Sequence, residues 1–431
     1  MHRATTIGES GSNSRGIRCL DRLHRSRVRI ALVHHWLVTR RGGERVLEAL
    51  AERFPSADLF TLVCDRRMLP SSLSRLRIRA SLLQNLPRAT RWYPYYLPVF
   101  PMATRQLDLT GYELVVSSDA ALIKGIRIDD GARHICYCHS PMRCLWSGYE
   151  SYRHAAPPLV RFTLSALRDH LCRWDYQAAQ RVDFFIANSE NVKARIQRFY
   201  GRESVVIHPP VDTQRFIVDS RTPQRDGFFL TVSQLVHYKR IDLIVDAFTV
   251  CKLPLLIIGD GPERQKLERR AGKNIRFAGS LPQRHVVKAM QPCKAFVFAG
   301  EEDFGIVMAE AHACGTPVVA FAKGGALEII EDNLTGVLFD ESSVDSLLQA
   351  LDRFDHASFD PELIRASAMR FTRQRFLDEF TGLLRQCVLH EAPDGAIPHA
   401  APGWISCGGS ISLATEGPSP VAQPNMPSSQ P

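Results

Sequence analysis

The sequence FVFAGEEDFGIVMAEAHACGTPVVA, residues 296–320, predicts a buried strand, a tight turn and a helix in direct succession. An apolar run typical of a buried strand covers residues 296–298. Apolar residues then recur at helical spacing from Ile306 to Ala313, which places the turn at residues 302–305. Strand–turn–helix units of this kind build parallel sheets that are covered by helices.

Two glutamates, Glu302 and Glu310, flank the start of this helix. The first amides of a helix lack internal partners and carry the positive end of its dipole, so a diphosphate can bind there, and Gly305 allows close approach. The helical part of the spacing is roughly 7 Å, which lets one carboxylate reach a transferred sugar and the other a ribose. For an isolated pair, two solvated charges beside an amphipathic helix are the ordinary interpretation.

The same alternation of strand and helix patterns fills two blocks of the chain. RIALVHH precedes GGERVLEALAERF in the first block, and FFLTVSQL precedes RIDLIVDAF in the second. The sequence therefore predicts an α/β fold with two Rossmann-like parallel-sheet domains. The predicted divisions are a disordered basic extension (1–27), a first domain (28–206), a Pro-bearing linker (207–227), a second domain (228–365), a terminal helix (366–388) and a disordered Pro/Ser-rich tail (389–431).

Length and composition agree with two soluble domains. The chain has 431 residues, 45% of them hydrophobic and 23% charged, which is ordinary for globular proteins. No apolar run approaches the roughly 18 residues that span a bilayer, and no signal peptide is apparent, so we expect a cytoplasmic protein. Eleven cysteines without a framework favour reduced thiols, and the cluster of Cys136, Cys138 and Cys144 is interpreted as structural rather than metal-binding.

Several segments together resemble the retaining glycosyltransferases of family four, which have the GT-B fold of two Rossmann-like domains facing a cleft. Residues 302–310 are similar to the family's Glu-x7-Glu signature. Further matches in the second block are LTVSQLVHYKRIDLIVDAF, LLIIGDGPERQKLE, IRFAGSLP and GTPVVAFAKGGALEII. In the first block, RIALVHHWLVTRRGGERVLEALAERFP, ICYCHSPMRCLW and DFFIANSENVKARIQRFYG resemble mannosyltransferase-like members that build bacterial polysaccharides. The resemblance covers roughly residues 28–388, and it implies that the terminal helix crosses back onto the first domain.

The resemblance implies a donor site in the second domain. Glu302 would orient the sugar, Glu310 would bind the ribose, and Ser280 lies in the base-contacting loop. The diphosphate would be held by Lys239 and by the amides of Phe304, Gly305 and Ile306. Many relatives have an arginine where this chain has Gln234. Either Lys239 and the amides suffice, or an arginine from elsewhere substitutes, or the donor site is weakened.

The first domain would contribute the acceptor side of the site. Gly43, after Gly42, would let the backbone approach the diphosphate. From sequence alone, His139 is better interpreted as a hydrogen-bonded core histidine. Its match to the family's active-site histidine implies instead that it would stabilise charge on the donor. Arg143 would bind an acceptor phosphate or serve as a structural surface arginine. The predicted catalytic residues are thus His139, Glu302 and Lys239.

The resemblance also implies the reaction. We expect transfer of mannose from GDP-mannose onto a glycan or polyprenyl-diphosphate-linked acceptor in bacterial polysaccharide biosynthesis. The alternatives are a UDP-sugar-dependent transferase of the same fold and a catalytically decayed scaffold that binds a nucleotide sugar. We expect no cofactor and no metal requirement, because Lys239 and the helix terminus can replace a metal ion at the phosphates.

The formal charge of +9 raises the question of an anionic partner. No recognised nucleic-acid module accompanies it, so an anionic substrate or lipid surface is favoured over nucleic acid. PRATRWYPYYLPVFP, residues 87–101, mixes arginines with Tyr95, Tyr96 and Phe100, which is typical of a segment that contacts a membrane interface. A buried loop is the alternative. On the first interpretation, we expect a cytoplasmic protein that contacts the inner membrane peripherally.

Overall fold

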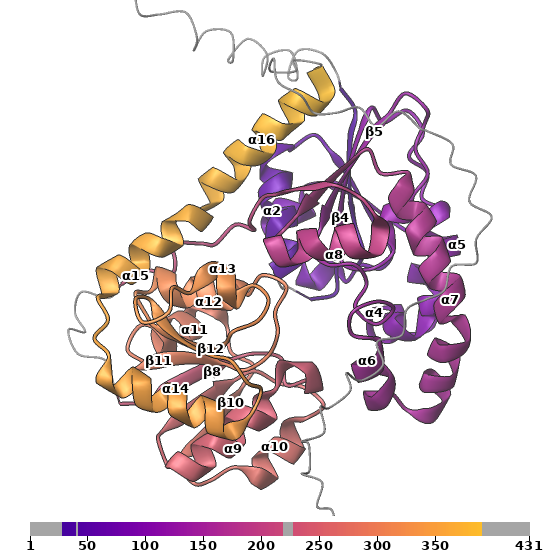
Figure 1. Ribbon diagram of the computed structural model, residues 1–431. Coiled ribbons are helices and arrows are strands. Elements are labelled where there is room, and N and C mark those ends of the chain that lie inside the picture. The colour runs from indigo at the N-terminus through magenta and orange to yellow at the C-terminus, as the bar shows by residue number, and fades with distance from the viewer. Residues whose placement is uncertain (1–27, 40–41, 219–226, 390–431) are drawn as a thin grey trace, which may run out of the picture. The chain divides into compact units, whose positions relative to one another are not determined.

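A computed structural model describes residues 28–39, 42–218 and 227–389 (Figure 1). The predicted basic extension (1–27), most of the second half of the predicted linker (219–226) and the predicted tail after its first residue lie outside the described residues. Over the described ranges, no helix combines the length and the apolar character needed to cross a membrane.

The first block forms a seven-stranded parallel sheet with the strand order β3-β2-β1-β4-β5-β6-β7. Its strands are β1 (Ile30–His34), β2 (Asp58–Thr61), β3 (Arg77–Ala80), β4 (Leu114–Asp119), β5 (Arg133–Cys138), β6 (Phe184–Ala187) and β7 (Ser204–Val206). Its helices are α2 (Gly42–Arg53), α3 (Ser71–Ser74), α4 (Ala89–Trp92), α5 (Phe100–Arg105), α6 (Tyr149–Ala155), α7 (Pro158–Gln180) and α8 (Glu190–Tyr200). Short 3₁₀ turns are η1 (Arg66–Met68), η2 (Leu82–Asn85), η3 (Tyr93–Val99) and η4 (Ile123–Gly125).

The second block forms a six-stranded parallel sheet with the order β10-β9-β8-β11-β12-β13. Its strands are β8 (Phe229–Val232), β9 (Leu255–Ile258), β10 (Ile275–Gly279), β11 (Ala295–Phe298), β12 (Val318–Phe321) and β13 (Gly336–Phe339). Its helices are α9 (Ile241–Cys251), α10 (Arg264–Arg270), α11 (Gln283–Met290), α12 (Ile306–Ala313), α13 (Ala326–Ile329), α14 (Val344–His356) and α15 (Pro361–Ala368), with η5 (His237–Lys239) and η6 (Met369–Phe371). Two parallel sheets confirm the predicted fold class.

Neighbouring residues of a strand point to opposite faces of the sheet, so one strand can supply apolar side chains to the helices on both faces. In β4, Val115 packs into one apolar cluster and Val116 into another. All six residues of β4 are buried, as expected for the central strand of a sheet with helices on both faces. The strand order reverses between β1 and β4 in the first sheet and between β8 and β11 in the second. Open sheets bind ligands at the carboxyl ends of strands at such switch points.

The terminal helix α16 (Arg373–Leu389) packs against the first sheet's α2 (Figure 1). Phe376 and Phe380 are buried in the apolar cluster that contains Leu47 of α2. Arg373 also pairs with Glu52 of α2 at 2.6 Å. The helix begins at Arg373 rather than at residue 366, because α15 and η6 occupy the preceding residues and η6 ends in an extended residue, Thr372.

The segment 87–101, predicted as a membrane-contacting surface, folds into α4, η3 and the start of α5. Its aromatic residues do not share one environment. Phe100 is only 1% exposed and packs in the core, so the expectation that it lies on the surface is wrong. The Tyr96 hydroxyl donates to the Pro87 carbonyl at 2.7 Å. Tyr95 is 61% exposed and remains available for an external contact.

Candidate active site

The second sheet places Lys239 and Glu302 together at its switch point. Lys239 ends η5 in the loop that follows β8, and Glu302 follows β11, the neighbour of β8. The Lys239 ammonium pairs with the Glu302 carboxylate. Its Nζ also lies 5.2 Å from the ring centre of Tyr238 and 5.8 Å from that of Phe298. Aromatic faces attract cations, so this lysine is held in one place by three contacts.

Gly305 makes the turn from this loop into α12. Its φ of 92° lies in the left-handed region, and a β-carbon at this position would be 2.1 Å from Cε of Met308. Both observations require glycine here. Within the described residues no side chain caps α12, so its first amides keep their capacity to bind an anion. The side chain of Phe304 is buried, which leaves only its backbone for a ligand contact.

Glu310 lies on the second turn of α12 and is 2% exposed. Its carboxylate pairs with Arg45, which extends from α2 of the first sheet. A β-carbon on Gly42 would lie 3.6 Å from Cγ2 of Ile306, so the start of α2 also adjoins the start of α12. Both predicted carboxylates are therefore bound by a cation in this structure, one from each block of the chain.

His139 follows β5, and its Nε2 lies 2.8 Å from Oγ of Ser118. A β-carbon on Gly43 would lie 3.4 Å from the same nitrogen, so Gly43 packs directly against this ring. Burial lowers the pKa of His139 to about 3, with repulsion from His35 acting in the same direction. The imidazole is therefore neutral, and it can offer an N–H as a donor but cannot offer a full positive charge.

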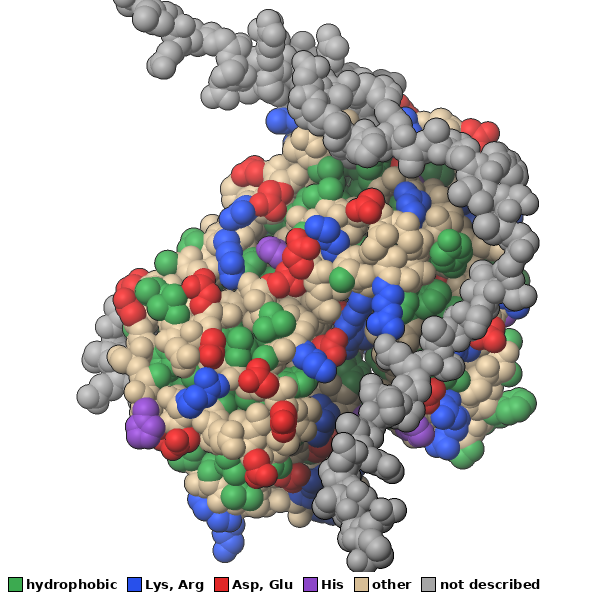
Figure 2. Space-filling view, viewed as in Figure 1, with side chains coloured by type: hydrophobic (Ala, Val, Ile, Leu, Met, Phe, Trp, Pro, Cys, Tyr) green, Lys and Arg blue, Asp and Glu red, His purple; other side chains and the backbone are tan. Residues whose placement is uncertain are grey.

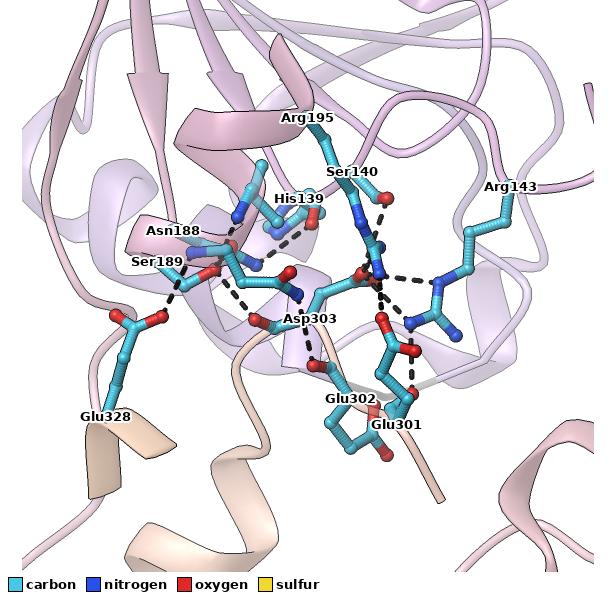
Figure 3. A network of polar contacts seen from close by, with 12 residues as sticks. His139, Ser140, Arg143, Asn188, Ser189, Arg195, Glu301, Glu302, Asp303 and Glu328 are labelled. Atoms are coloured by element: carbon cyan, nitrogen blue, oxygen red, sulfur yellow. Dashed lines mark hydrogen bonds and ion pairs between the residues drawn. The ribbon is translucent and has the colours of Figure 1, made fainter. Parts of the chain in front are cut away.

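A second polar network joins the loop 301–303 to the first block (Figure 3). Arg143 donates to Oδ1 of Asp303 from Nε at 3.2 Å and from Nη2 at 3.0 Å. Arg195 of α8 pairs with both Asp303 and Glu301. Burial alone would lower the pKa of Arg143, but Asp303 and Glu302 raise it above its ordinary value.

Polar groups at the start of α8, including its N-cap Ser189, bind the backbone of the same loop (Figure 3). Ser189 donates to the carbonyl oxygen of Asp303 at 2.7 Å, and Asn191 donates to that of Glu302 at 3.4 Å. Arg143, predicted at the acceptor, binds the Asp303 carboxylate and the Glu301 carbonyl oxygen here. The orientation of Glu302 thus depends on side chains that lie more than a hundred residues away in sequence.

One predicted donor residue, Ser280, lies apart from this cluster, whereas Gln234 lies on the loop that leads into η5. Ser280 follows the edge strand β10 and is exposed, three strands away from β11. Gln234 lies after β8, where its carbonyl oxygen accepts from the amide of Val236 at 2.9 Å. Sequence reasoning missed Arg45, Asp303 and Arg195. The acidic run 301–303 was a signal that cations must lie nearby, but nothing local identified which ones.

Two family models match the chain in succession. The one described as glycosyltransferase family 4 matches residues 40–215, and the one described as glycosyl transferases group 1 matches residues 212–365. A GDP-mannose-dependent alpha-(1-6)-phosphatidylinositol monomannoside mannosyltransferase of Mycolicibacterium smegmatis is 31% identical over 192 residues, which are 38% of this chain and 50% of that protein. The O-antigen chain mannosyltransferase C of Escherichia coli is 27% identical over 187 residues, 40% of this chain and 50% of that protein. The chain thus spans about half the length of these two relatives.

Solved structures share the fold over most of the chain. The sucrose-phosphate synthase of Thermosynechococcus elongatus superimposes with a TM-score of 0.63 at 20% identity, covering 84% of this chain and 100% of the other. Anabaena HepE in complex with UDP-glucose gives a TM-score of 0.61 at 16% identity, covering 83% and 99%. These likenesses confirm the predicted GT-B fold.

Proposed function

Because this chain belongs to the glycosyltransferases of family four, we propose that it transfers a hexose from a nucleotide-sugar donor to an acceptor hydroxyl, with retention of the anomeric configuration. One observation carries the proposal. Glu302 and Glu310 are each paired with a cation around the uncapped start of α12. A sugar nucleotide carries hydroxyls at its two ends and phosphates in its middle. Carboxylates suit the hydroxyls, and cations suit the phosphates.

Donor binding would exchange the partners of these charged groups. The diphosphate would bind the first amides of α12 and attract Lys239 and Arg45 away from the two glutamates. Glu302 would then be free to bind sugar hydroxyls, and Glu310 the ribose hydroxyls. Arg45 is in this proposal the cation from elsewhere that compensates for Gln234, because its guanidinium already lies beside α12.

The mechanism follows from the charge that moves during transfer. As the bond to the nucleotide breaks, negative charge builds on the diphosphate and positive charge builds on the sugar ring. Lys239 and the α12 amides would stabilise the departing diphosphate. The neutral ring of His139 would donate a hydrogen bond to an oxygen of the donor. Neither glutamate is assigned as a nucleophile, because a two-carboxylate glycosidase needs both carboxylates at one anomeric carbon.

The proposed donor is GDP-mannose, and the proposed acceptor is a glycan or a polyprenyl-diphosphate-linked glycan in bacterial polysaccharide biosynthesis. Support comes from the two relatives, one described as GDP-mannose-dependent and both as mannosyltransferases. A UDP-sugar donor is the alternative within the same fold. A non-catalytic scaffold that binds a nucleotide sugar is the second candidate, and Gln234 is the observation that favours it.

We also propose a peripheral contact with the anionic face of the inner membrane. Tyr95 in η3 and Leu159 and Phe162 in α7 are 61%, 77% and 73% exposed. The two elements contact one another. Residues 87–105 contain three arginines and no acidic residue. Exposed apolar side chains beside arginines suit a surface that inserts at the headgroup level of an anionic bilayer.

Calorimetric titration of the full chain with GDP-mannose, UDP-glucose and UDP-galactose tests the donor. Nucleotide release in the presence of a lipid-linked glycan extract tests turnover. We expect binding and turnover with GDP-mannose. We expect Lys239→Ala and Glu302→Ala to lower kcat by about 100-fold or more, because each removes a group that contacts the reacting donor. Glu331→Ala, at an exposed glutamate outside the site, is the matched control and should keep wild-type kcat.

The outcomes separate the candidates. Binding with a UDP-sugar alone would replace the proposed donor while preserving the transferase. Donor binding without turnover in the parent protein would favour the scaffold. If the parent binds none of these nucleotide sugars, the proposed function is wrong.

A further inference from the structure

Three histidines meet at the switch point of the first sheet. His34 ends β1, His35 follows it, and His139 follows β5. Oγ of Ser118, in β4, lies 3.0 Å from Nδ1 of His34 and 2.8 Å from Nε2 of His139. Nδ1 of His35 lies 3.2 Å from the carbonyl oxygen of Ser118. One buried serine therefore contacts all three rings.

The rings of His34 and His139 are both neutral. Removal from water is the largest cause, and His35 adds repulsion against a second positive charge. The pKa of His34 consequently lies well below its usual range, and the pKa of His139 is lowered to about 3. Asp119 and Asp303 oppose this shift at His139 without reversing it. Each ring thus carries one N–H and one bare nitrogen.

The hydroxyl of Ser118 has one proton, so it donates to one of these two rings and accepts from the other. If it donates to His34, the proton of His34 is on Nε2, a buried atom with no hydrogen-bond partner among the described residues. If it donates to His139, then His34 donates from Nδ1 and its Nε2 is a bare nitrogen. A buried N–H without an acceptor is the rarer and costlier defect, so the second arrangement is favoured.

We propose that Ser118 is a positioning residue that fixes His139 in the tautomer with its proton on Nδ1. No described residue accepts a hydrogen bond from this Nδ1, so its N–H stays available for an oxygen of the donor sugar or of the departing diphosphate. The start of α2 packs on the same rings, because a β-carbon on Gly43 would lie 3.5 Å from Cε1 of His34. The inference rests on the proposed transferase function, since the accepting oxygen belongs to the donor.

The neighbouring serine provides a matched control. Ser117 also lies in β4, is fully buried, and places its Oγ 2.8 Å from Nε2 of His134. Because adjacent strand residues point to opposite faces, Ser117 contacts a histidine on the other side of the sheet. Ser117→Ala therefore removes one buried serine–histidine hydrogen bond, whereas Ser118→Ala removes two, those to His34 and His139. Only Ser118→Ala affects His139.

Two measurements on the full chain test the proposal. Long-range ¹H–¹⁵N spectra of protein labelled with ¹⁵N-histidine report which ring nitrogen carries the proton, and a His139→Gln sample identifies the signal of His139. Steady-state kinetics with GDP-mannose separate kcat from KM. We expect wild-type His139 to show the Nδ1–H pattern. We expect Ser118→Ala to shift it toward Nε2–H and to lower kcat about 10- to 100-fold with KM changed less than about threefold.

Ser118→Thr, which retains the hydroxyl, should keep the Nδ1–H pattern and recover most of kcat, while Ser117→Ala should stay within about twofold of wild type. The proposal is overturned if the His139 signal is the same in wild type and Ser118→Ala, or if wild-type His139 is the Nε2–H tautomer. An equal loss of kcat in the two alanine variants also contradicts it. Absence of turnover in wild type counts against the transferase function alone, because the spectra still report the tautomer.

Discussion

In the proposed function, Arg45 would serve both stability and substrate binding. It pairs with Glu310, whose side chain is only 3% exposed, while 25% of the Arg45 side chain is exposed. Removing the partner of a buried charge is costly because the remaining charge stays desolvated. A bound diphosphate would offer Arg45 a stronger partner than a single carboxylate, and the ribose hydroxyls would then satisfy Glu310.

We therefore expect Arg45→Ala to have two separable effects. The free energy of unfolding should fall by about 1–3 kcal/mol, because Glu310 loses its cation in a partly buried site. KM for the donor should rise about tenfold, which corresponds to about 1.4 kcal/mol of lost binding. Urea unfolding measures the first effect, and steady-state kinetics measure the second.

The double variant Arg45→Ala/Glu310→Gln distinguishes the two roles. Neutralising Glu310 removes the unpaired buried charge, so the stability should largely return. The donor KM should remain raised, because the cation is still missing. If the double variant instead regained wild-type KM, Arg45 would act on the donor only through Glu310, contrary to the proposed diphosphate contact.

At the scale of elements, α12 carries both a proposed donor-binding residue and core residues. Glu310 pairs toward α2, whereas His312, two residues later, is fully buried where α12 packs on α15. Its Nδ1 lies 3.1 Å from Oγ of Ser367, and its Nε2 has no partner among the described residues. Burial lowers the pKa of His312 to about 3, with Arg370 acting in the same direction. The folded state therefore favours the neutral form of this ring.

This histidine should make stability depend on pH. Its pKa is about 3 when folded and about 6.5 when unfolded, so between these values the unfolded state binds more protons and stability falls as pH falls. One such group contributes about 1.4 kcal/mol per pH unit, so acidification from about pH 6.5 to about pH 4.5 should cost about 2–3 kcal/mol. In His312→Asn, the loss of unfolding free energy between these two pH values should be smaller by this amount. Urea unfolding at each pH measures it.

The exposed His356 on α14 supplies the comparison, since its side chain is 81% exposed. His356→Asn should leave the acid slope of the wild type unchanged. An identical slope for His312→Asn and wild type would show that His312 does not take up a proton on unfolding in this range.

Local patterns predicted the elements well because their causes are local. The apolar run and the helical spacing in residues 296–320 correspond to β11 and α12, and Gly305 occupies the left-handed turn between them. The predicted start of the terminal helix was wrong, because the extended backbone of a single residue, Thr372, separates η6 from α16. Helix ends of this kind leave little trace in residue patterning.

At the scale of the whole molecule, the site depends on pairings between distant residues. The partners Arg195 and Asp303 are 108 residues apart, and Arg45 and Glu310 are 265 apart. No periodicity or motif connects residues over such distances. Composition likewise gave the net charge of +9 but not its placement. The sequence also left open whether Phe100 is exposed or buried, because its burial depends on packing against the rest of the first sheet's core.

The proposed membrane contact depends on which side chains are exposed at the surface. Figure 2 shows that one face carries apolar, basic and acidic side chains in mixture, so a docking area must be identified from individual exposures. Leu159 and Phe162 lie one turn apart at the start of α7, with the exposed Arg161 between them in sequence. An apolar pair beside a cation on one helix end suits the interface of an anionic bilayer.

Phe162→Glu should weaken binding of the full chain to phosphatidylglycerol vesicles about tenfold or more, because it removes an apolar side chain that would insert into the bilayer and adds repulsion from the anionic headgroups. Val250→Glu is the matched control, since Val250 on α9 is 63% exposed and gains the same charge. Co-sedimentation measures both variants against phosphatidylcholine vesicles, to which the wild type should bind weakly. Equal losses in the two variants would assign any binding to net charge alone, and absence of wild-type binding to anionic vesicles would remove the membrane contact from the proposed function.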